Sequence, residues 1–317
     1  MAGVEVAAQG WLLTGILLLV PALLATVARE PLSSGRRWRL ALIALAAPLF
    51  CPTRGVPSAI ATGLAVVIAS RLPDLSVRPP FEPLASRLLW LMTPMVARIP
   101  ADPARRAHNR RGAPRFLLRA LLKRLAWEPF GFGMTLLEPT QAPPLLKTAL
   151  LVLYFVLNLT ALADVALALA RLLGADTEEL FDAPLLAASP REFWSRRWNR
   201  YIGRFALRHV AVPLQGRVPR PVVMMTVFVA SAVFHEYFAW GAAGGETRPG
   251  TMTAFFLVHG LAVVLGERFP LPTGTPRIFK HLGTVGWMLL TAPWFFTSLR
   301  PALVDFGLSP AWLYLPG

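Results

Sequence analysis

The sequence contains one cysteine, Cys51, in 317 residues. A single cysteine excludes an intramolecular disulfide framework and any cysteine-rich metal site. Because Cys51 is followed by Pro52 where an apolar run ends, we expect it to fill a small apolar space rather than to act as a catalytic thiol.

Charged residues are also scarce, and acidic residues are the scarcest of them. Only 15% of the chain is charged and 55% is hydrophobic, with a mean hydropathy of +0.52, whereas a soluble domain is about 25% charged. The composition therefore predicts a polytopic integral membrane protein, and the length leaves room for a single domain over residues 1–317. The net charge of +15 indicates cytoplasmic loops and contact with anionic lipid headgroups. Nucleic acid is a poor alternative partner, because apolar runs separate the basic residues.

Several catalytic motifs are missing. His235-Glu236 would begin a metalloprotease His-Glu-x-x-His motif, but position 239 is alanine. There is no Gly-x-Ser-x-Gly elbow and no phosphate-binding Gly-x-x-x-x-Gly-Lys loop. No histidine is followed by an acid five residues later, which excludes the His-x4-Asp arrangement, and no Asp-rich pair is present for Mg-diphosphate chemistry. We predict no metal site and no cofactor.

Eight apolar runs are long enough, or nearly long enough, to cross a bilayer. The first is longer than a signal-peptide core and lacks a basic leader, so we interpret it as a transmembrane helix. The fourth is short and contains Arg87 and Pro94, which favours a re-entrant or interfacial helix. These features predict an all-α protein with about eight transmembrane helices. The runs are residues 10–28, 40–50, 56–70, 84–97, 145–173, 222–243, 251–266 and 278–299.

Two charged features accompany these runs. Residues 116–127 alternate apolar and basic side chains at helical spacing, which predicts a basic amphipathic helix on the membrane surface. Asp164 lies inside the longest apolar run. A carboxylate at that depth is costly, so we expect it to face protein rather than lipid.

The stretch from Ser189 to Asn199 is rich in arginine and tryptophan although it lies between apolar runs. On a helix, Trp194, Trp198 and Tyr201 would share one face at i, i+4 and i+7. One interpretation is an interfacial amphipathic helix whose arginines reach toward the headgroups. The other is a basic, aromatic site for a phosphorylated ligand with Asn199 turned inward.

His235 lies well inside the apolar run 222–243. Ionisable groups at such depth mark functional sites by default, and Ser231 lies one turn earlier, close enough to bond the imidazole and set its tautomer. A structural histidine joining two helices is the alternative. His259 lies in the next apolar run, where a helix-packing role is the more common one.

Three blocks of the sequence resemble the signature of plant-type wax synthases, a branch of the membrane-bound O-acyltransferase superfamily. The first runs from Phe181-x-x-Pro184 through Ala188-Ser189 to Glu192-Phe193-Trp194-Ser195-Arg196-Arg197-Trp198-Asn199. The second is Ser231-Ala232-Val233-Phe234-His235-Glu236, and the third is Phe255-Phe256-Leu257-Val258-His259-Gly260 with Glu267. The blocks occur in the family order over residues 181–267.

The resemblance implies a helical bundle around an intramembrane reaction chamber, with acyl-CoA entering from the cytosol and the acyl acceptor from the bilayer. It pairs His235 with Asn199 as catalytic residues, and Ser231, Glu236 and His259 would support them. A neutral histidine suits the removal of an alcohol proton, and an amide can donate to a developing oxyanion. The diphosphate and phosphate of acyl-CoA would be bound at the basic, aromatic stretch, by Trp194, Arg196, Arg197, Trp198 and Arg200.

These expectations describe an acyl-CoA-dependent O-acyltransferase that esterifies a lipophilic alcohol, as in wax ester synthesis. The acceptor could also be a sterol, a terpenoid, a polyketide hydroxyl or diacylglycerol. A proton-coupled transporter using His235 and Asp164 is the alternative from another class, and a non-catalytic lipid-binding scaffold is a third. The Ala-, Arg- and Leu-rich composition suggests a bacterial cytoplasmic membrane.

Overall fold

The computed structural model describes residues 2–27, 32–53, 56–77, 84–136, 143–243, 247 and 249–305. Most of the described chain is helical, and one two-stranded sheet is the only sheet in that part, which confirms the predicted all-α class. Within the described residues, six helices are long and apolar enough to cross a membrane. They are α1 (Ala2–Val27), α3 (Val56–Arg71), α7 (Pro144–Leu172), α11 (Arg220–Ala242), α12 (Thr251–Arg268) and α13 (Arg277–Asp305).

Two of the eight apolar runs give helices that fall short of a full crossing. The run 40–50 forms the end of α2 (Ser34–Ala46) and a single 3₁₀ turn, η1 (Ala47–Phe50). The run 84–97 forms the nine-residue helix α4 (Leu84–Met92) and then leaves helical geometry. At about 1.5 Å per residue, neither reaches across a hydrocarbon core of about 30 Å.

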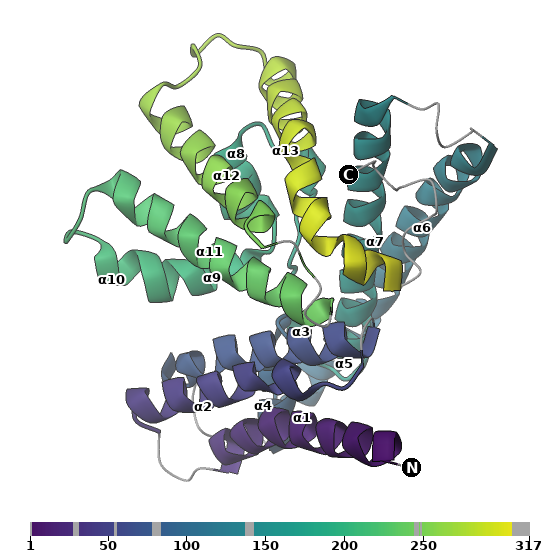
Figure 1. Cartoon of the computed structure of the whole chain (residues 1–317), viewed down its shortest axis with the longest axis vertical. Coiled ribbons are helices and arrows are strands. Elements are labelled where there is room, and N and C mark those ends of the chain that lie inside the picture. The colour runs from purple at the N-terminus through teal and green to yellow at the C-terminus, as the bar shows by residue number, and fades with distance from the viewer. Residues whose placement is uncertain are drawn as a thin grey trace.

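Helices α1 to α4 pack into one block at the N-terminal end of the chain, shown in purple and blue at the bottom of Figure 1. Alanines make up much of its interior, including Ala22, Ala44 and Ala65. Small side chains let helices approach closely in the absence of a hydrophobic driving force between them. The runs 40–50 and 56–70 meet in this block, where α2 packs on α3. Residues 54 and 55, which connect them, lie outside the described residues.

Helices α6 (Ala113–Leu136) and α7 form a long hairpin at one side of the molecule (Figure 1). Asp164 of α7 faces this partner, as predicted, with its side chain 2% exposed. It accepts a hydrogen bond from Lys123 Nζ at 2.6 Å and pairs with Arg119 at 2.9 Å. The surface-helix interpretation of residues 116–127 was therefore incomplete, because two of the basic side chains turn toward α7. The exposed side chains include Leu117, Leu118, Leu121, Leu122 and Leu125.

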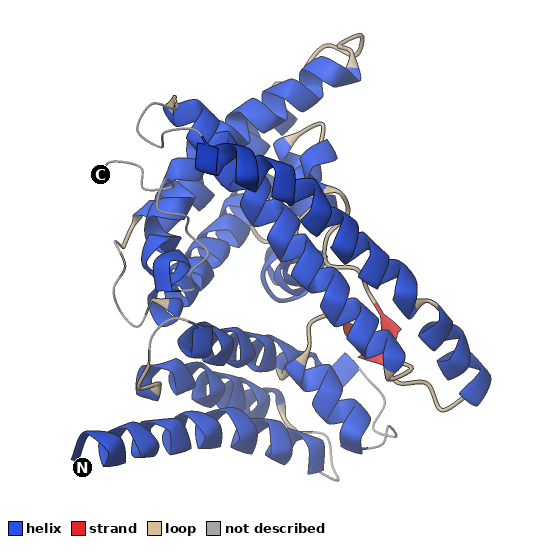
Figure 2. Cartoon of the chain, turned by 90° about the vertical axis from the view of Figure 1, so that its right-hand side faces the viewer, coloured by secondary structure: helices blue, strands red, loops and turns tan. Residues whose placement is uncertain are grey.

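A short antiparallel sheet lies beside this hairpin (Figure 2). Its strands are β1 (Val96–Arg98) and β2 (Asp176–Thr177). Partial burial raises the pKa of Asp176, but hydrogen bonds from Asn109, Arg98 and Arg105 outweigh that effect, and the pKa lies below its usual range. The carboxylate thus joins β1, β2 and α5 (Pro103–Arg111).

Helices α11, α12 and α13 form a second group above the N-terminal block (Figure 1). Gly260 of α12 sits directly against α11, since a Cβ at this position would lie 2.9 Å from the side chain of Phe228. At the N-terminal end of α11, Arg220 pairs with Glu267 of α12. Close packing at one point and an ion pair at another fix how α11 and α12 face each other.

Candidate functional site

The arginine- and tryptophan-rich stretch does not form the continuous helix that its spacing suggests. A short helix α8 (Pro190–Glu192) leads into a π-helical turn, η4 (Phe193–Arg197), and α9 (Arg200–Ala206) begins after a break. Trp198 is extended at the break, and Asn199 is left-handed, with φ 36° and ψ 62°. The structure therefore corrects the single-helix interpretation. Asparagine is one of the few residues that adopts this conformation readily.

Asn199 is held by one end of its side-chain amide. Its Oδ1 accepts a hydrogen bond from the backbone N–H of Ile202 at 3.3 Å, which caps the N-terminus of α9. Among the described residues the structure shows no partner for its Nδ2 group, and the side chain is half-buried. An amide carries its donors only on nitrogen, so Asn199 is fixed by its acceptor and its donors remain available.

Glu192 and Arg197 stabilise this turn through hydrogen bonds and an ion pair with each other. Ser189 Oγ accepts from the N–H of Glu192 at 3.0 Å, and Glu192 accepts from the N–H of Ala188 at 2.8 Å. The hydrogen bond from Ala188 and the neighbouring Arg197, 2.7 Å away, hold the pKa of Glu192 below its usual range. Arg197 also donates to the carbonyl of Asp182. Ser189 and Glu192 form the Ser-x-x-Glu pattern that is typical of helix starts, so this part of the arrangement is visible in the sequence.

The two tryptophans of the stretch pack inside the protein. Trp198 stacks on Phe193, with ring centroids 5.4 Å apart, and contacts Phe181 at 5.0 Å. The Trp194 indole donates to His259 Nδ1 at 3.2 Å. Both rings are half-buried, and their inward contacts set the position of the turn.

His235 on α11 is held in one tautomer by the backbone. Its Nδ1 lies 2.7 Å from the carbonyl oxygen of Ser231. A carbonyl only accepts, so Nδ1 carries the proton in this hydrogen bond and the lone pair lies on Nε2. Ser231 therefore sets the tautomer through its backbone, and not through its hydroxyl. The geometry leaves Nε2 as a proton acceptor.

His259 on α12 has the opposite tautomer. Its Nδ1 accepts from Trp194, which can only donate, so its proton lies on Nε2, 2.8 Å from Thr291 Oγ1 on α13. Its side chain is completely buried. Because both nitrogens are engaged, His259 joins three segments of the chain and has no lone pair free for a substrate. This supports its interpretation as a helix-packing hydrogen bonder.

The three sequence blocks meet at Phe256. This ring is 1% exposed and lies against the imidazole of His235, with centroids 4.2 Å apart. On its other side it contacts Trp194, at 5.4 Å. Phe256 was not predicted as a site residue, although it lies in the third block. It connects the turn that carries Asn199 to the helix that carries His235.

Glu236, next to His235, binds backbone rather than the imidazole. Its Oε1 accepts from the N–H of Gly250 at 2.8 Å, from the N–H of Thr253 at 2.9 Å and from the Thr253 hydroxyl at 3.1 Å. These N–H groups belong to the start of α12 and have no partner within their own helix. Glu236 thus caps α12 from α11, and so holds Phe256 against His235.

This geometry predicts different outcomes for two substitutions of Glu236. Glu236→Gln keeps an oxygen that accepts the same hydrogen bonds, so we expect activity within about threefold of the wild-type value. Glu236→Ala leaves backbone donors without a partner, which costs about 1–3 kcal/mol, and should lower the melting temperature together with kcat. Melting curves and turnover of the purified variants test this. An inactive but stable Glu236→Gln variant would instead indicate that the carboxylate takes part in proton transfer.

The arginines of the stretch fall into two groups. Arg197 pairs with Glu192, and Arg191 pairs with Glu267 at 2.9 Å. Arg196 and Arg200 are exposed on either side of the break, and the described part of the structure shows no partner for their side chains. Of the predicted phosphate-binding arginines, these two have side chains free for an anion.

Comparison with known proteins agrees with the motif analysis. Residues 177–258 match the model of the Membrane bound O-acyl transferase family. This interval includes the first two blocks and the beginning of the third, so the resemblance drawn from the blocks is confirmed there. Every residue of the turn around Asn199, and His235 itself, lies within the matched interval.

Several curated plant proteins are similar to the chain. Probable long-chain-alcohol O-fatty-acyltransferase 2 of Arabidopsis thaliana is 32% identical over 138 residues, 39% of either protein. Probable long-chain-alcohol O-fatty-acyltransferase 6 of the same plant is 26% identical over 203 residues, 57% of either protein. The long-chain-alcohol O-fatty-acyltransferase of Simmondsia chinensis is 29% identical over 49% of this chain and 46% of that protein. The chain thus aligns with about two-fifths to three-fifths of the length of these relatives.

Proposed function

We propose that the protein is an integral-membrane O-acyltransferase that transfers a fatty acyl group from acyl-CoA to the hydroxyl of a lipophilic alcohol, forming a wax ester. The observation that carries this proposal is the imidazole of His235, whose tautomer exposes a basic Nε2 within a membrane-spanning helix. The family match over residues 177–258 and the names of the plant relatives support it.

In the proposed reaction His235 acts as a general base. Its Nε2 takes the proton of the alcohol while the alcohol oxygen bonds to the carbonyl carbon of the thioester. The bond from that carbon to sulfur breaks, and the leaving CoA thiolate takes the proton from the imidazolium of His235, which restores the base. The free amide hydrogens of Asn199 would donate to the carbonyl oxygen as it becomes negative. Among the described residues the Ser231 hydroxyl makes no hydrogen bond to the imidazole, whose Nδ1 binds the Ser231 carbonyl instead. No serine beside the base is therefore activated as a nucleophile, and we propose direct transfer without an acyl-enzyme.

The apolar surroundings of His235 fit this chemistry. The imidazole is covered by Phe256 and Phe234, at centroid distances of 4.2 and 4.9 Å. Aromatic walls exclude water, which would otherwise hydrolyse the thioester. We propose no metal or prosthetic group, and acyl-CoA serves as a co-substrate.

The transporter alternative depends on Asp164 and His235 acting as a proton relay. Asp164 is instead paired with Lys123 and Arg119 of α6, whereas His235 binds the backbone of its own helix and a ring of α12. These contacts favour a structural role for Asp164 and leave the acyltransferase as the better-supported function.

Arg196 and Arg200 would bind the phosphates of CoA, since exposed guanidinium groups recognise phosphate well. We expect Arg196→Glu and Arg200→Glu to raise KM for acyl-CoA by about tenfold or more, while KM for the alcohol changes less than twofold. Arg217→Glu makes the same charge change at an exposed site outside the stretch and should leave both constants near wild type. Steady-state kinetics with each substrate varied in turn test this. A parallel rise of both KM values would contradict the assignment.

We place the protein in the cytoplasmic membrane of a bacterium on the grounds of its composition, although the named relatives are from plants. Sterols, terpenoids, polyketides and diacylglycerol are the other candidate acceptors. Cells that express the chain can be fed each class of alcohol, and their lipids extracted. We expect esters of long-chain alcohols to accumulate. If none of these esters accumulates above its level in control cells, the proposed function is contradicted.

A further inference from the structure

A small apolar cavity lies between the N-terminal block and the segment that carries the candidate site. Its volume is about 160 Å³. The walls come from α2, α3, α9, the π-helical turn η5 (Leu207–Ala211) and α11. The lining is nearly all apolar and includes Trp38, Leu45, Val66, Phe205, Ala230 and Phe234. A cavity of this size and apolar lining suits a segment of a hydrocarbon chain.

Two hydroxyl groups belong to this lining, and they differ in their partners. Ser70 is 2.5 Å from the hydroxyl of Tyr201, so each satisfies the other. No hydrogen bond of the Ser231 hydroxyl is seen among the described residues, although the carbonyl of the same residue binds His235 Nδ1 at 2.7 Å. Ser231 is therefore a polar group of the cavity wall that is open to a ligand, and its own backbone positions the candidate base.

The cavity lining is also linked to Asn199, the other candidate catalytic residue. Ile202 lines it, and the N–H of Ile202 binds the side chain of Asn199 at 3.3 Å. Phe234 lines it too and is the neighbour of His235. The lining thus includes a residue bonded to Asn199 and the sequence neighbour of His235, although neither candidate catalytic residue lines the cavity itself.

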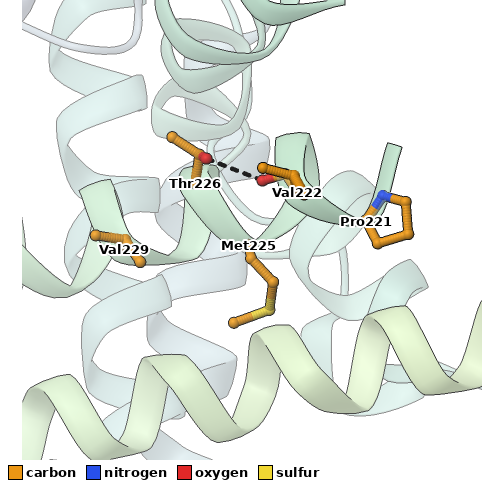
Figure 3. A pocket seen from close by; sticks show the side chains of 5 residues that line it. All are labelled: Pro221, Val222, Met225, Thr226 and Val229. Atoms are coloured by element: carbon orange, nitrogen blue, oxygen red, sulfur yellow. Dashed lines mark hydrogen bonds between the residues drawn. The ribbon is translucent and has the colours of Figure 1, made fainter. Parts of the chain in front are cut away.

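Another hollow on α11 lacks these features. Figure 3 shows this shallow groove of about 330 Å³, lined by Pro221, Val222, Met225, Thr226 and Val229. Its hydroxyl, on Thr226, donates to the carbonyl of Val222 at 2.9 Å. The groove therefore offers an apolar surface without a free polar group and without contact to the candidate site.

We propose that the cavity between α2, α3, α9 and α11 binds the alkyl chain of the acceptor alcohol, with Ser231 hydrogen-bonded to the alcohol hydroxyl. This rests on the proposed function. The alcohol is the better match of the two substrates, because its polar group is one hydroxyl and the wall offers one free hydroxyl. The CoA moiety requires cations, and the lining contains none.

The first test fills part of the cavity with a larger side chain on α11. Ala230→Phe places a ring in the lining, whereas Val233→Phe adds the same ring at a side chain that is 66% exposed. We expect Ala230→Phe to lower kcat/KM for a hexadecanol acceptor by about 10-fold or more relative to a short-chain alcohol, since a methylene in a hydrophobic pocket is worth about 10–200-fold. The dependence on acyl chain length should stay unchanged, and Val233→Phe should behave as wild type. A change in acyl-length preference instead would overturn the proposal.

The second test concerns Ser231 and has two parts, a kinetic measurement and a crosslinking measurement that does not require turnover. Ser231→Ala retains the backbone carbonyl that holds His235, so we expect KM for the alcohol to rise by up to about tenfold with little change in KM for acyl-CoA. In parallel, a long-chain alcohol bearing a terminal diazirine is photo-crosslinked to the wild-type protein, and we expect labels on α2, α3 or α11 within the lining. Labels elsewhere would overturn the proposed cavity. Correct labelling without ester formation would contradict the proposed function and leave the binding site supported.

Discussion

The variant His235→Ala is expected to lose most of its turnover, with kcat lower by about 10²–10⁴, the usual effect of removing a general base. Protein level and acyl-CoA affinity should change little, because the one hydrogen bond of the imidazole seen among the described residues goes to the backbone of its own helix. Ester formation and acyl-CoA binding by the purified variant are the measurements. Near-normal turnover in a well-folded variant would contradict the role of His235.

His259→Ala provides the contrast. Removing this ring leaves the buried indole N–H of Trp194 without its acceptor, which costs about 1–3 kcal/mol. We therefore expect a lower melting temperature and a partial loss of activity, in proportion to the loss of folded protein. A stable His259→Ala protein without turnover would move the catalytic assignment from His235 to His259.

Asn199→Ala and Asn199→Asp separate capping from catalysis. The alanine variant loses the cap on α9, which costs about 0.5–2 kcal/mol, and loses the amide donor as well. The aspartate variant keeps an oxygen to accept from Ile202 and tolerates the left-handed backbone, so its stability should be near wild type. In both variants we expect kcat to fall by about 10²–10³, as on removal of an oxyanion donor.

Acyl-CoA affinity should change much less than kcat in these variants, because the proposed hydrogen bond strengthens only in the transition state. Melting temperature, kcat and acyl-CoA binding are measured for both. A stable and active Asn199→Asp enzyme would show that donation by the amide is not needed. Asn199 would then be only a helix cap.

The membrane-spanning elements were the most predictable part of the fold. Apolar runs of sufficient length gave the positions of α7, α11, α12 and α13 to within a few residues, because a bilayer imposes length and hydropathy directly. Asp164 was correctly expected to face protein, since a carboxylate in lipid is too costly. Its partners on α6 could not be predicted, because helical spacing alone does not show which face of α6 meets α7.

The candidate site could be located in the sequence, but its geometry could not be predicted from it. The sequence blocks singled out Asn199, His235 and His259, and the structure distinguishes the last two by their tautomers, which depend on partners distant in sequence. Periodicity suggested a helix through Trp198, whereas Asn199 breaks it, because a left-handed residue interrupts helical hydrogen bonding whatever the spacing of the aromatic residues. Phe256 was missed, since a phenylalanine in an apolar run carries no signal of its contact with His235.

The central claim is that this chain transfers an acyl group from CoA to a lipophilic alcohol with His235 as the base. Its most direct test uses the purified protein in lipid nanodiscs with acyl-CoA and a long-chain alcohol, quantifying free CoA and ester together by mass spectrometry. We expect CoA and ester in a 1:1 ratio that depends on the alcohol, and neither product above background with His235→Ala. Release of CoA without ester, or equal ester formation by wild type and His235→Ala, would contradict the claim.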